Sequence, residues 1–489
     1  MSHCRSLYRH TRVIWLTLIV AVSVTACASQ PQPPAVALPA PASWSAVTTQ
    51  AAASAPIEHA WWTQLNDHAV NMLTTAALTD NPTLAQAMGR VDEANANLGV
   101  RTAQRLPALQ ASLGASRGKS ADGGDMTYGS VASAGLALSW EIDLFGRVRA
   151  TIDSAQYRLD ARHADAEAAR LSLTARVADT VLALRGCRFS QAVLRDDIES
   201  RALTLKLTQS KLQAGAIAAV DAARARASLA GARTTLALRQ QECTGHLNAL
   251  VMLTGLDVAS IAALMEVQVS ANSSASMPRY AEWVMPSAPK YRIAVPAAVL
   301  AKHPAVRAAE AELSAAWSEI NTARAERLPR LDLGAALSGQ WIRAGTQGAS
   351  AWSIGPGLSM PLFDGGRGAA VVLASEARYR QALATLRLAV RTATQDVENA
   401  LAASLSAGMR LDTTRDAVDA AQSVFDTSNA MWRGGATSLF VLEDARRVLA
   451  SAQNDAIAAV QDSSQAWIAL VLACGNSSII SESSQYENL

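Results

Sequence analysis

The chain has 489 residues, of which 50% are hydrophobic, 5% aromatic and 17% charged. Its formal net charge is +2, and removal of the three arginines in the export signal described below leaves 2 − 3 = −1. A charge so close to zero excludes a generally basic nucleic-acid-binding protein. Alanine dominates the hydrophobic residues, and alanine-rich helices pack through narrow seams, so the composition favours long packed helices over a globular enzyme.

Residues 1–26 read as an export signal, with a basic start and an apolar run from Val13 to Val24 that is too short to span a bilayer. The run ends at Thr25-Ala26-Cys27, which resembles the bacterial lipobox, where the cysteine becomes the lipid-bearing N-terminus. Ordinary cleavage beside a chance cysteine is the alternative. The residue after Cys27 is not aspartate, which in Gram-negative lipoproteins favours sorting to the outer membrane. Residues 27–60 are expected to form a lipid-anchored tether rich in proline and alanine, and no later stretch looks long and apolar enough for a membrane helix.

The rest of the chain is an internal repeat. Asn81-Pro82 recurs as His303-Pro304 and Leu106-Pro107 as Leu328-Pro329, each with a step of 222 (303 − 81 and 328 − 106). Each half reads as a helix, a β-hairpin, a very long helix, a tight turn and a second long helix. The predicted boundaries are 61–256 for the first repeat, 257–296 for a linker, 297–475 for the second repeat and 476–489 for a C-terminal tail.

Two segments, at about 108–145 and 330–363, alternate with the period of a β-strand whose two faces differ. Four strands cannot close on themselves, and an open sheet edge is not tolerated in lipid, because each unsatisfied backbone group costs several kcal/mol. Three chains supply 3 × 4 = 12 strands, which is within the usual range for a barrel with a lumen. The sequence therefore predicts a homotrimer that shares one transmembrane barrel.

The long helices predict a coiled coil in each repeat. Residues 146–212 lack proline and carry a heptad seam, and the chain then turns near Gly215. The second repeat runs similarly from Gly368 to a turn at Gly435, where glycine permits positive φ. The expected fold is mainly α with a β-barrel contribution: an internally duplicated, trimeric, 12-stranded barrel of four strands per chain, continued by a long α-helical coiled-coil barrel.

Two cysteines lie at equal distances from the first turn: 215 − 187 = 28 and 243 − 215 = 28. An antiparallel hairpin brings Cys187 and Cys243 level, and a disulfide formed in an oxidising compartment stabilises by roughly 3–4 kcal/mol in the entropic treatment. The alternative is two buried thiols that only pack. Cys474 has no evident partner.

Each turn is followed by a charged pair three residues apart, Asp221 with Arg224 and Asp444 with Arg447. Such a spacing places both charges on one helix face. One interpretation is a solvated pair that contributes a few tenths of a kcal/mol. The other is an ionic constriction, in which copies of the pair meet around a threefold axis and close the mouth of the tube.

Several motifs resemble those of outer-membrane factors, the TolC-like exit ducts of tripartite efflux pumps, and most closely the NodT-type lipoproteins. They are Trp61-Trp62, Trp140-Glu141-Ile142-Asp143-Leu144-Phe145-Gly146-Arg147, Pro361-Leu362-Phe363-Asp364-Gly365-Gly366-Arg367, and Gly435-Ala436-Thr437-Ser438-Leu439 followed by Val441-Leu442. The resemblance spans residues 60–472. It implies a passive outer-membrane duct that extends into the periplasm, is driven by an inner-membrane pump, and meets a periplasmic adaptor protein.

The same resemblance assigns roles to residues. Asp444 and Arg447 match the family's periplasmic gate, with Phe440 as a hydrophobic constriction one turn earlier. The tips at Gly215, Gly435 and Ser438 correspond to the adaptor-docking region.

Enzyme chemistry finds no support, because the seven histidines are scattered without metal-ligand spacing and the Gly365–Gly368 cluster lacks the lysine of a phosphate loop. We expect no catalytic residue, metal or cofactor apart from the lipid on Cys27. The expected function is efflux of drugs or other small solutes. Type I polypeptide secretion and metal-ion efflux remain open, as does a non-porating structural lipoprotein, although a coiled-coil spacer needs no alternating hairpins.

Overall fold

The structure is a computed structural model that describes residues 41–45, 60–122, 125–266, 291–293, 296–342, 348–475 and 479–481. The predicted lipidation site at Cys27 lies outside the described residues. The chain divides into two compact units, one of residues 1–38, 89–164 and 307–388 and the other of residues 39–88, 165–306 and 389–489. Each unit therefore contains segments from both sequence repeats.

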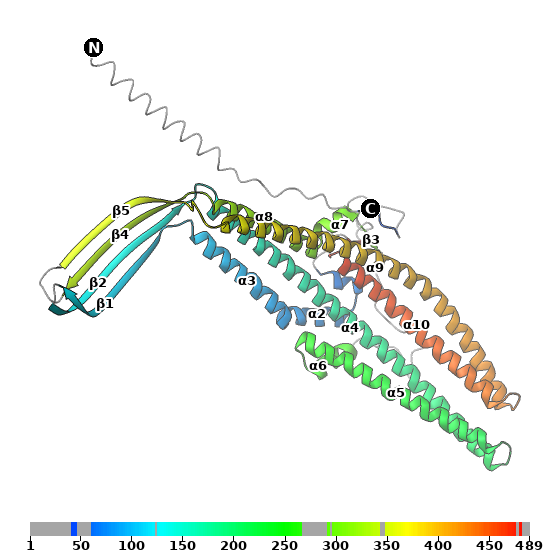
Figure 1. Cartoon of the computed structure of the whole chain (residues 1–489). Helices are drawn as coiled ribbons and strands as arrows, with labels where there is room; N and C mark the ends of the chain where they lie inside the picture. Colours follow the sequence, from blue (N-terminus) through cyan, green and yellow to red (C-terminus); the bar gives the residue numbers. More distant parts are fainter. Residues whose placement is uncertain are drawn as a thin grey trace. The chain divides into compact units, whose positions relative to one another are not determined.

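The first unit contains a four-stranded antiparallel sheet with the order β1-β2-β4-β5 (Figure 1). The strands are β1 (Ala108–Asp122), β2 (Asp125–Ile142), β4 (Arg330–Ile342) and β5 (Gly348–Ser359). The pairing of β2 with β4 joins the two repeats and places Leu136 opposite Leu337. Both hairpins predicted from the two-residue alternation are present, and together they form one sheet.

Four helices continue from the strands: α3 (Pro82–Ala103), α4 (Arg147–Gln213), α8 (Pro304–Ala325) and α9 (Arg367–Arg433). Within the first unit, α4 and α8 are joined by an ion pair between Arg162 and Glu312 with an N–O distance of 2.8 Å. The ring of Trp317 on α8 lies edge-on to Tyr379 on α9, with centroids 5.5 Å apart. Polar and aromatic contacts thus join these helices, as alanine-rich surfaces offer few large apolar side chains.

The second unit contains two helical hairpins, each built as its repeat predicts. The later part of α4 pairs with α5 (Ala219–Thr254), and the later part of α9 pairs with α10 (Leu439–Ala473) (Figure 1). Small side chains dominate the seam between α9 and α10, where Ala421, Ala452 and Ala456 are buried with Val418 and Leu449. Close packing of this kind is what the alanine-rich composition predicts.

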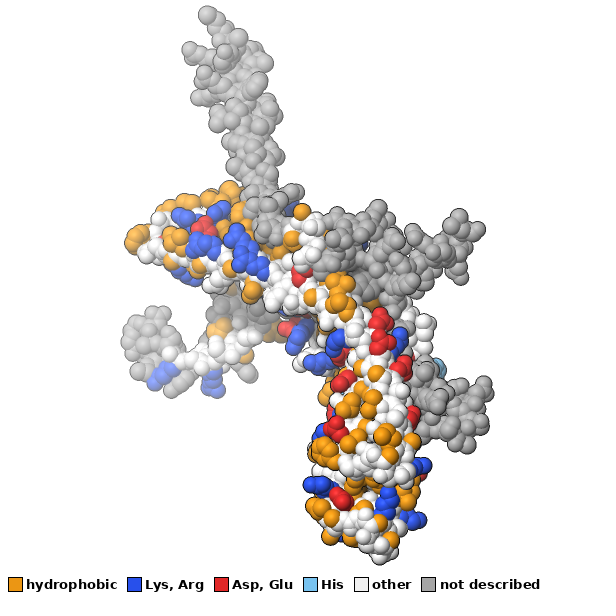
Figure 2. Space-filling model, turned by 90° about the vertical axis from the view of Figure 1, so that its right-hand side faces the viewer, with side chains coloured by type: hydrophobic (Ala, Val, Ile, Leu, Met, Phe, Trp, Pro, Cys, Tyr) orange, Lys and Arg blue, Asp and Glu red, His pale blue; other side chains and the backbone are white. Residues whose placement is uncertain are grey.

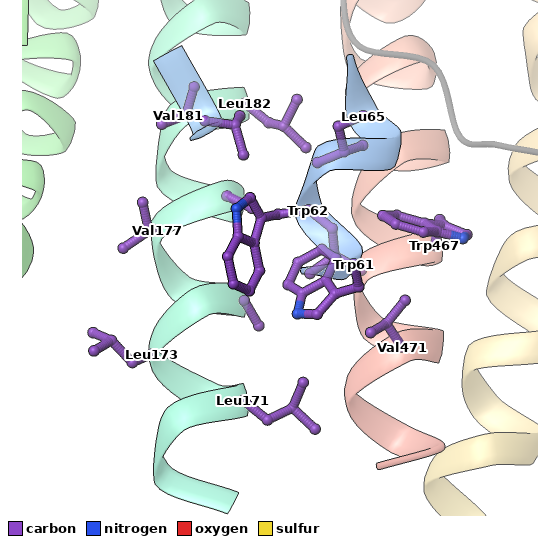
Figure 3. Close-up of a cluster of buried hydrophobic side chains, with 14 of the residues drawn as sticks. Trp61, Trp62, Leu65, Leu171, Leu173, Val177, Val181, Leu182, Trp467 and Val471 are labelled. Atoms are coloured by element: carbon purple, nitrogen blue, oxygen red, sulfur yellow. The ribbon is translucent and has the colours of Figure 1, made fainter. Parts of the chain in front are cut away.

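The main hydrophobic core of the second unit surrounds the tryptophan pair (Figure 3). Trp61 and Trp62 belong to the short 3-10 helix η1 (Trp61–Leu65), and Trp61 packs against Trp467 of α10 with ring centroids 5.5 Å apart. The indole N–H of Trp61 donates to the hydroxyl of Thr174 at 3.1 Å, which satisfies its one polar atom. The tryptophan motif therefore fastens η1 to α4 and α10.

Next to this core, α2 (His68–Asp80) begins at Asp67, whose carboxylate accepts a hydrogen bond from the backbone N–H of Val70 at 3.1 Å. The same carboxylate forms a buried ion pair with Arg185 at 2.8 Å. The shorter elements are α6 (Val258–Glu266), α7 (Pro296–Lys302) and a small sheet of β3 (Tyr291–Ile293) with β6 (Ile479–Ser481).

The expectation that no later stretch is long and apolar enough for a membrane helix is wrong when length and composition alone are considered. Among the described helices α10 is long and apolar enough to cross a membrane, and the bent pair α5 and α6 passes the same test only if counted as one span. However, 56% of the most apolar window of α10 is buried inside the protein. The hydrophobicity of α10 is explained by its packing, since Trp467, Leu470 and Val471 are fully covered by the core.

Candidate functional site

The sheet has two faces of opposite character. One face is apolar, and its large side chains are Leu109, Leu113, Leu136, Leu138, Trp140, Leu331, Leu333, Leu337, Trp341, Trp352, Ile354 and Leu358. The other face carries small or polar side chains, among them Gln110, Ser112, Ser116, Ser133, Ala137, Ser139, Ala336, Ser338, Gln340, Ala351 and Ser353. Leu113 is 87% exposed and Trp352 77% exposed. An exposed apolar face opposite a polar one is the arrangement of a wall between lipid and water.

Both outer strands of this sheet lack a partner within the described chain. β1 and β5 stand at the two ends of the strand order, with 15 and 12 residues respectively. Their outward backbone N–H and C=O groups need partners, because an open edge in lipid leaves them unsatisfied. The single chain is thus an incomplete wall.

Acidic side chains fix the bends where strands become helices. The carboxylate of Asp143 accepts hydrogen bonds from the backbone N–H groups of Val148 and Arg149 at the start of α4. At the start of α9, Asp364 accepts from Gly366 at 2.9 Å and Gly368 at 2.6 Å, and these bonds lower the pKa of Asp364 below its ordinary value. An aspartate therefore caps the equivalent helix in each repeat, Asp143 four residues before the start of α4 and Asp364 three residues before the start of α9.

The turns at the hairpin tips have the same geometry in both repeats. Gly215 has φ of +72° and Gly435 has φ of +78°. In each turn the following residue donates its N–H to a carbonyl five residues earlier, from Ala216 to Lys211 and from Ala436 to Met431, both bonds being 2.8–2.9 Å long. This is a Schellman-type helix end, which favours glycine at the left-handed position.

In each predicted charged pair, the arginine and the aspartate form an ion pair within one helix. Arg447 contacts Asp444, and the side chains are 75% and 49% exposed. Arg224 lies 3.8 Å from Asp221, with 65% and 33% exposure. Phe440 is also exposed, at 70%. Within one chain these residues lie on open faces, and Figure 2 shows positive, negative and hydrophobic side chains mixed at the tip end.

Close to the predicted gate lies a buried charge network that the sequence analysis missed. Glu443 and Arg446 of α10 have side chains only 20% and 4% exposed. Arg446 Nη2 donates to the hydroxyls of Ser200 and Thr204 on α4, each at 3.0 Å. Glu443 Oε2 lies 2.8 Å from Nη1 of Arg201, also on α4.

The network ties three helices together. Ser228 of α5 donates to Glu443 at 2.6 Å, and Arg201 forms a second ion pair with Asp197 at 2.8 Å. Burial is the main cause that lowers the pKa of Arg446, while Glu443 opposes this shift. The network therefore joins the α4–α5 hairpin to α10 of the second hairpin.

A sequence signal for this network exists. Leu439, Leu442, Arg446 and Leu449 step by three, four and three residues, and all four are buried. An arginine at a seam position of a coiled coil predicts a buried partner. The adjacent residues Asp444 and Arg447 point elsewhere because each residue turns the helix by about 100°.

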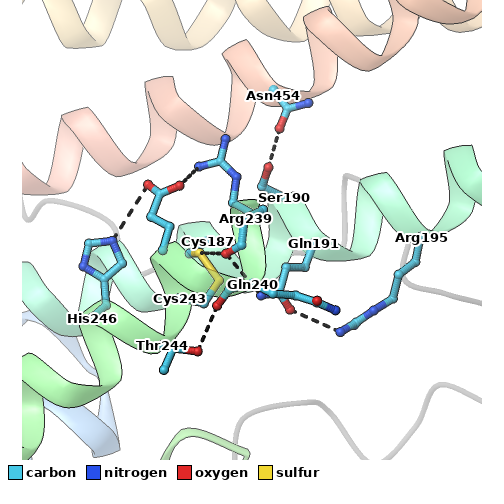
Figure 4. Close-up of a disulfide and its surroundings, with 11 residues drawn as sticks. Cys187, Ser190, Gln191, Arg195, Arg239, Gln240, Cys243, Thr244, His246 and Asn454 are labelled. Carbon is cyan, nitrogen blue, oxygen red and sulfur yellow. Dashed lines mark hydrogen bonds and ion pairs between the residues drawn. A yellow bond between two sulfur atoms is a disulfide. The ribbon is translucent and has the colours of Figure 1, made fainter. Parts of the chain in front are cut away.

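Cys187 and Cys243 meet between α4 and α5 as a disulfide, with their Cα atoms 5.6 Å apart (Figure 4). Both cysteines are buried. Ser190, one turn from Cys187, donates to Asn454 of α10 at 2.6 Å. Cys474 is a free and buried cysteine, and burial raises its pKa.

Comparison with known proteins identifies the family. The profile described as "Outer membrane efflux protein" matches residues 73–256 and 295–476. The chain belongs to the outer membrane efflux protein family. The sequence is 30% identical to the pyoverdine export outer membrane protein OpmQ of Pseudomonas aeruginosa over 425 residues, which cover 85% of this chain and 86% of OpmQ.

Two further comparisons extend this result. Nodulation protein T of Rhizobium leguminosarum bv. viciae is 29% identical over 418 residues, covering 85% of this chain and 83% of that protein. The solved outer-membrane channel OprN matches with a TM-score of 0.77 and 25% identity, over 92% of this chain and 98% of that structure. The predicted TolC-like fold and the likeness to NodT-type proteins are therefore confirmed.

The family assignment settles the class of activity. This outer membrane efflux protein is an outer-membrane channel of efflux pumps, and the family is one of channels and not of enzymes. Members of the family form trimeric channels. The two-faced sheet agrees with this class of activity.

Proposed function

We propose that three copies of this chain close their sheets into a 12-stranded barrel and act as the passive exit duct of a tripartite pump. The observation that carries the proposal is the sheet with one apolar face, one polar face and two unpaired edges. Pairing β5 of one copy with β1 of the next satisfies both edges. The apolar face then contacts lipid, and the polar face lines the lumen.

The lumen face suits a route for varied solutes. Its side chains between the strand feet and the turns are mainly serine, glycine, alanine and glutamine, with Val131 toward the turn and the charged residues Glu141, Arg330 and Asp332 at the foot. Such a surface offers hydrogen bonds without a strong binding site. We propose small solutes as cargo, in keeping with the relative OpmQ, whose name records pyoverdine export.

The proposed partners are a lipid anchor, an inner-membrane pump and a periplasmic adaptor. The mature chain is anchored to the outer membrane by a lipid on Cys27, and the helices extend into the periplasm. An inner-membrane pump supplies energy, and a periplasmic adaptor docks at the exposed tips near Gly215, Gly435 and Ser438. The mixed charge and small residues of these tips support docking of a helical hairpin.

The closed state combines two sets of charges. Copies of Asp444 and Arg447 meet around the threefold axis with Phe440, and Asp221 with Arg224 supports them from the first hairpin. The buried network of Glu443 and Arg446 with α4 holds the second hairpin against the first within each chain. Opening then requires separation of buried charges, a step for which the adaptor and pump supply the energy.

Adjacent residues on opposite faces of β4 test the proposal. Leu337→Arg places a charge on the lipid face, where a cation near the midplane costs about 2–4 kcal/mol. Ser338→Arg places the same charge in the lumen. We expect Leu337→Arg to reduce the yield of heat-modifiable trimer in outer-membrane fractions, while Ser338→Arg assembles normally and changes single-channel conductance. Equal assembly of the two variants would contradict the assignment of faces.

A further inference from the structure

The two β-hairpins of the chain are equivalent in register. In the first hairpin Ala108 pairs with Ser139, and in the second Arg330 pairs with Ser359. The first strands are therefore related by a step of 330 − 108 = 222 and the second strands by a step of 359 − 139 = 220. Each residue of one hairpin thus has a defined counterpart in the other.

The chain also contains one junction between two hairpins. β2 of the first hairpin pairs with β4 of the second, with Ser139 opposite Gly334 and Leu138 opposite Ala335. In every pair of this junction the two residue numbers add up to 473. The proposed trimer has three junctions of this kind within its chains and three more between β5 of one chain and β1 of the next.

We propose that β5 and β1 of neighbouring chains pair in the register of the internal junction, transferred by the repeat. The inference rests on the proposed function, because it requires three chains to share one barrel. The counterpart of Ser139 is Ser359, and that of Gly334 is residue 334 − 222 = 112, so Ser359 lies opposite Ser112 of the next chain. By the same steps Leu358 lies opposite Leu113, and the numbers of every pair add up to 471.

The side chains that this register brings together match in character. Leu113 and Leu358 both belong to the apolar face, and both are largely exposed in the single chain. Ser112 and Ser359 both belong to the polar face. A shift of one residue places apolar side chains of β1 opposite polar side chains of β5. The competing registers therefore differ from this one by two residues.

The register sets the width of the barrel through the stagger of its strands. A line perpendicular to the strands runs from Ala108 through Ser139 to Gly334, whose counterpart is Ser112, so one hairpin adds a stagger of 112 − 108 = 4 residues. Six equivalent hairpins add 6 × 4 = 24 residues. With about 3.4 Å per residue and about 4.8 Å between strands, 12 strands with this stagger have a circumference of about 100 Å.

This width agrees with the helices that continue from the strands. In the proposed trimer, twelve helices side by side at 8–10 Å need a circumference of roughly 96–120 Å. A register two residues shorter between chains lowers the total stagger to 18 residues and the circumference to about 84 Å, which is too narrow. A register two residues longer gives about 117 Å, and the equivalence of the hairpins decides against it.

Cysteine cross-linking of the full-length acylated protein in outer membranes tests the register. One variant is Ser112→Cys with Ser359→Cys, and the other is Leu113→Cys with Leu358→Cys. Because the two pairs lie on opposite faces, one is a hydrogen-bonded pair and the other is not, and both Cα separations suit a disulfide. We expect mild oxidation to shift the denatured, unreduced protein from the mass of one chain to that of three in one or both variants.

Two offset variants are matched controls, since each reports one competing register. Ser112→Cys with Gly357→Cys detects the shorter register, and Gly114→Cys with Ser359→Cys detects the longer one. A Cβ at Gly357 stays 3.8 Å from its nearest neighbour, and one at Gly114 meets a rotatable serine hydroxyl at 2.9 Å, so both sites accept a cysteine. Neither control should form a covalent trimer.

A covalent trimer in an offset variant, or in none of the four variants, overturns the register. The native thiol of Cys474 does not compete, because it is buried. Native mass spectrometry of the same membranes, extracted in mild detergent, separates the two claims. Three chains without the expected cross-link refute this register alone, whereas a monomer refutes the shared barrel of the proposed function.

Discussion

At the scale of single residues, one turn at the start of α10 carries two charged pairs, one buried and one exposed. Glu443 and Arg446 are spaced like Asp444 and Arg447, yet the first pair is largely buried against α4 and the second is exposed. A buried ion pair contributes less to stability than its short distances suggest, but loss of one partner is costly. The exposed pair contributes little within one chain and is available to another.

The buried arginine makes a direct prediction. Arg446→Met leaves Glu443 and Asp197 less compensated and should destabilise the tip by about 3–5 kcal/mol. Arg447→Met, one residue away and 75% exposed, should change stability by less than about 1 kcal/mol. Hydrogen exchange of the amides around residues 440–450 measures both. Similar protection in the two variants would show that the network does not hold the hairpins together.

Asp179 on α4 predicts a pH dependence. Burial raises its pKa to about 6, and its Oδ1 atom has no hydrogen-bond partner. Because the folded pKa exceeds the unfolded value of 3.8, folding stability falls as pH rises from about 4 to about 6 and stays low above that range. Asp179→Asn should therefore stabilise the protein at pH 8, by at most about 3 kcal/mol, with no gain at pH 4.

Chemical denaturation of the Asp179→Asn variant at the two pH values measures this difference. Asp412→Asn is the control, since the Asp412 side chain is 85% exposed. A gain from Asp179→Asn that is the same at pH 4 and pH 8 would assign the effect to packing and not to ionisation.

At the scale of elements, the hairpins and coiled coils were predictable because the two-residue alternation of a strand and the heptad spacing of a helix can be recognised within a short stretch of sequence. The alternation around Trp140 and the heptad seam through Cys187 need no knowledge of distant residues. The buried network was not found, because Arg446 becomes unusual only when its seam position is compared with Ser200 and Thr204 on another helix. The cap at Asp364 was not predicted either. The backbone N–H groups of Gly366 and Gly368 reach its carboxylate only because the chain bends there.

The disulfide joins α4 and α5 across a loop of 56 residues. In the entropic treatment a loop of that length gives about 4 kcal/mol. Denatured, unreduced protein should show a single free thiol, that of Cys474. Cys187→Ala with Cys243→Ala should lower the unfolding midpoint in denaturant, while Cys474→Ser tests an unpaired buried thiol. Three reactive thiols in the wild type would rule the bridge out.

At the scale of the whole molecule, the family match and the sheet chemistry agree on a channel, and the proposed gate requires contacts between copies. Asp444→Ala with Arg447→Ala should raise single-channel conductance, because the exposed pair is proposed to close the threefold opening. Asp412 and Arg415 on α9 form an exposed pair with the same spacing, 4.0 Å apart, and their double alanine variant is the matched control. Equal conductance of the two double variants would remove Asp444 and Arg447 from the gate.

One chain supplies four of the twelve strands of the proposed barrel, and the mass of the protein after extraction from the membrane measures this stoichiometry. Native mass spectrometry of the acylated protein, extracted from outer membranes in mild detergent, should give the mass of three chains, each carrying one lipid modification. A monomer under conditions that preserve its sheet would mean that β1 and β5 find their partners elsewhere, and the shared barrel would be wrong.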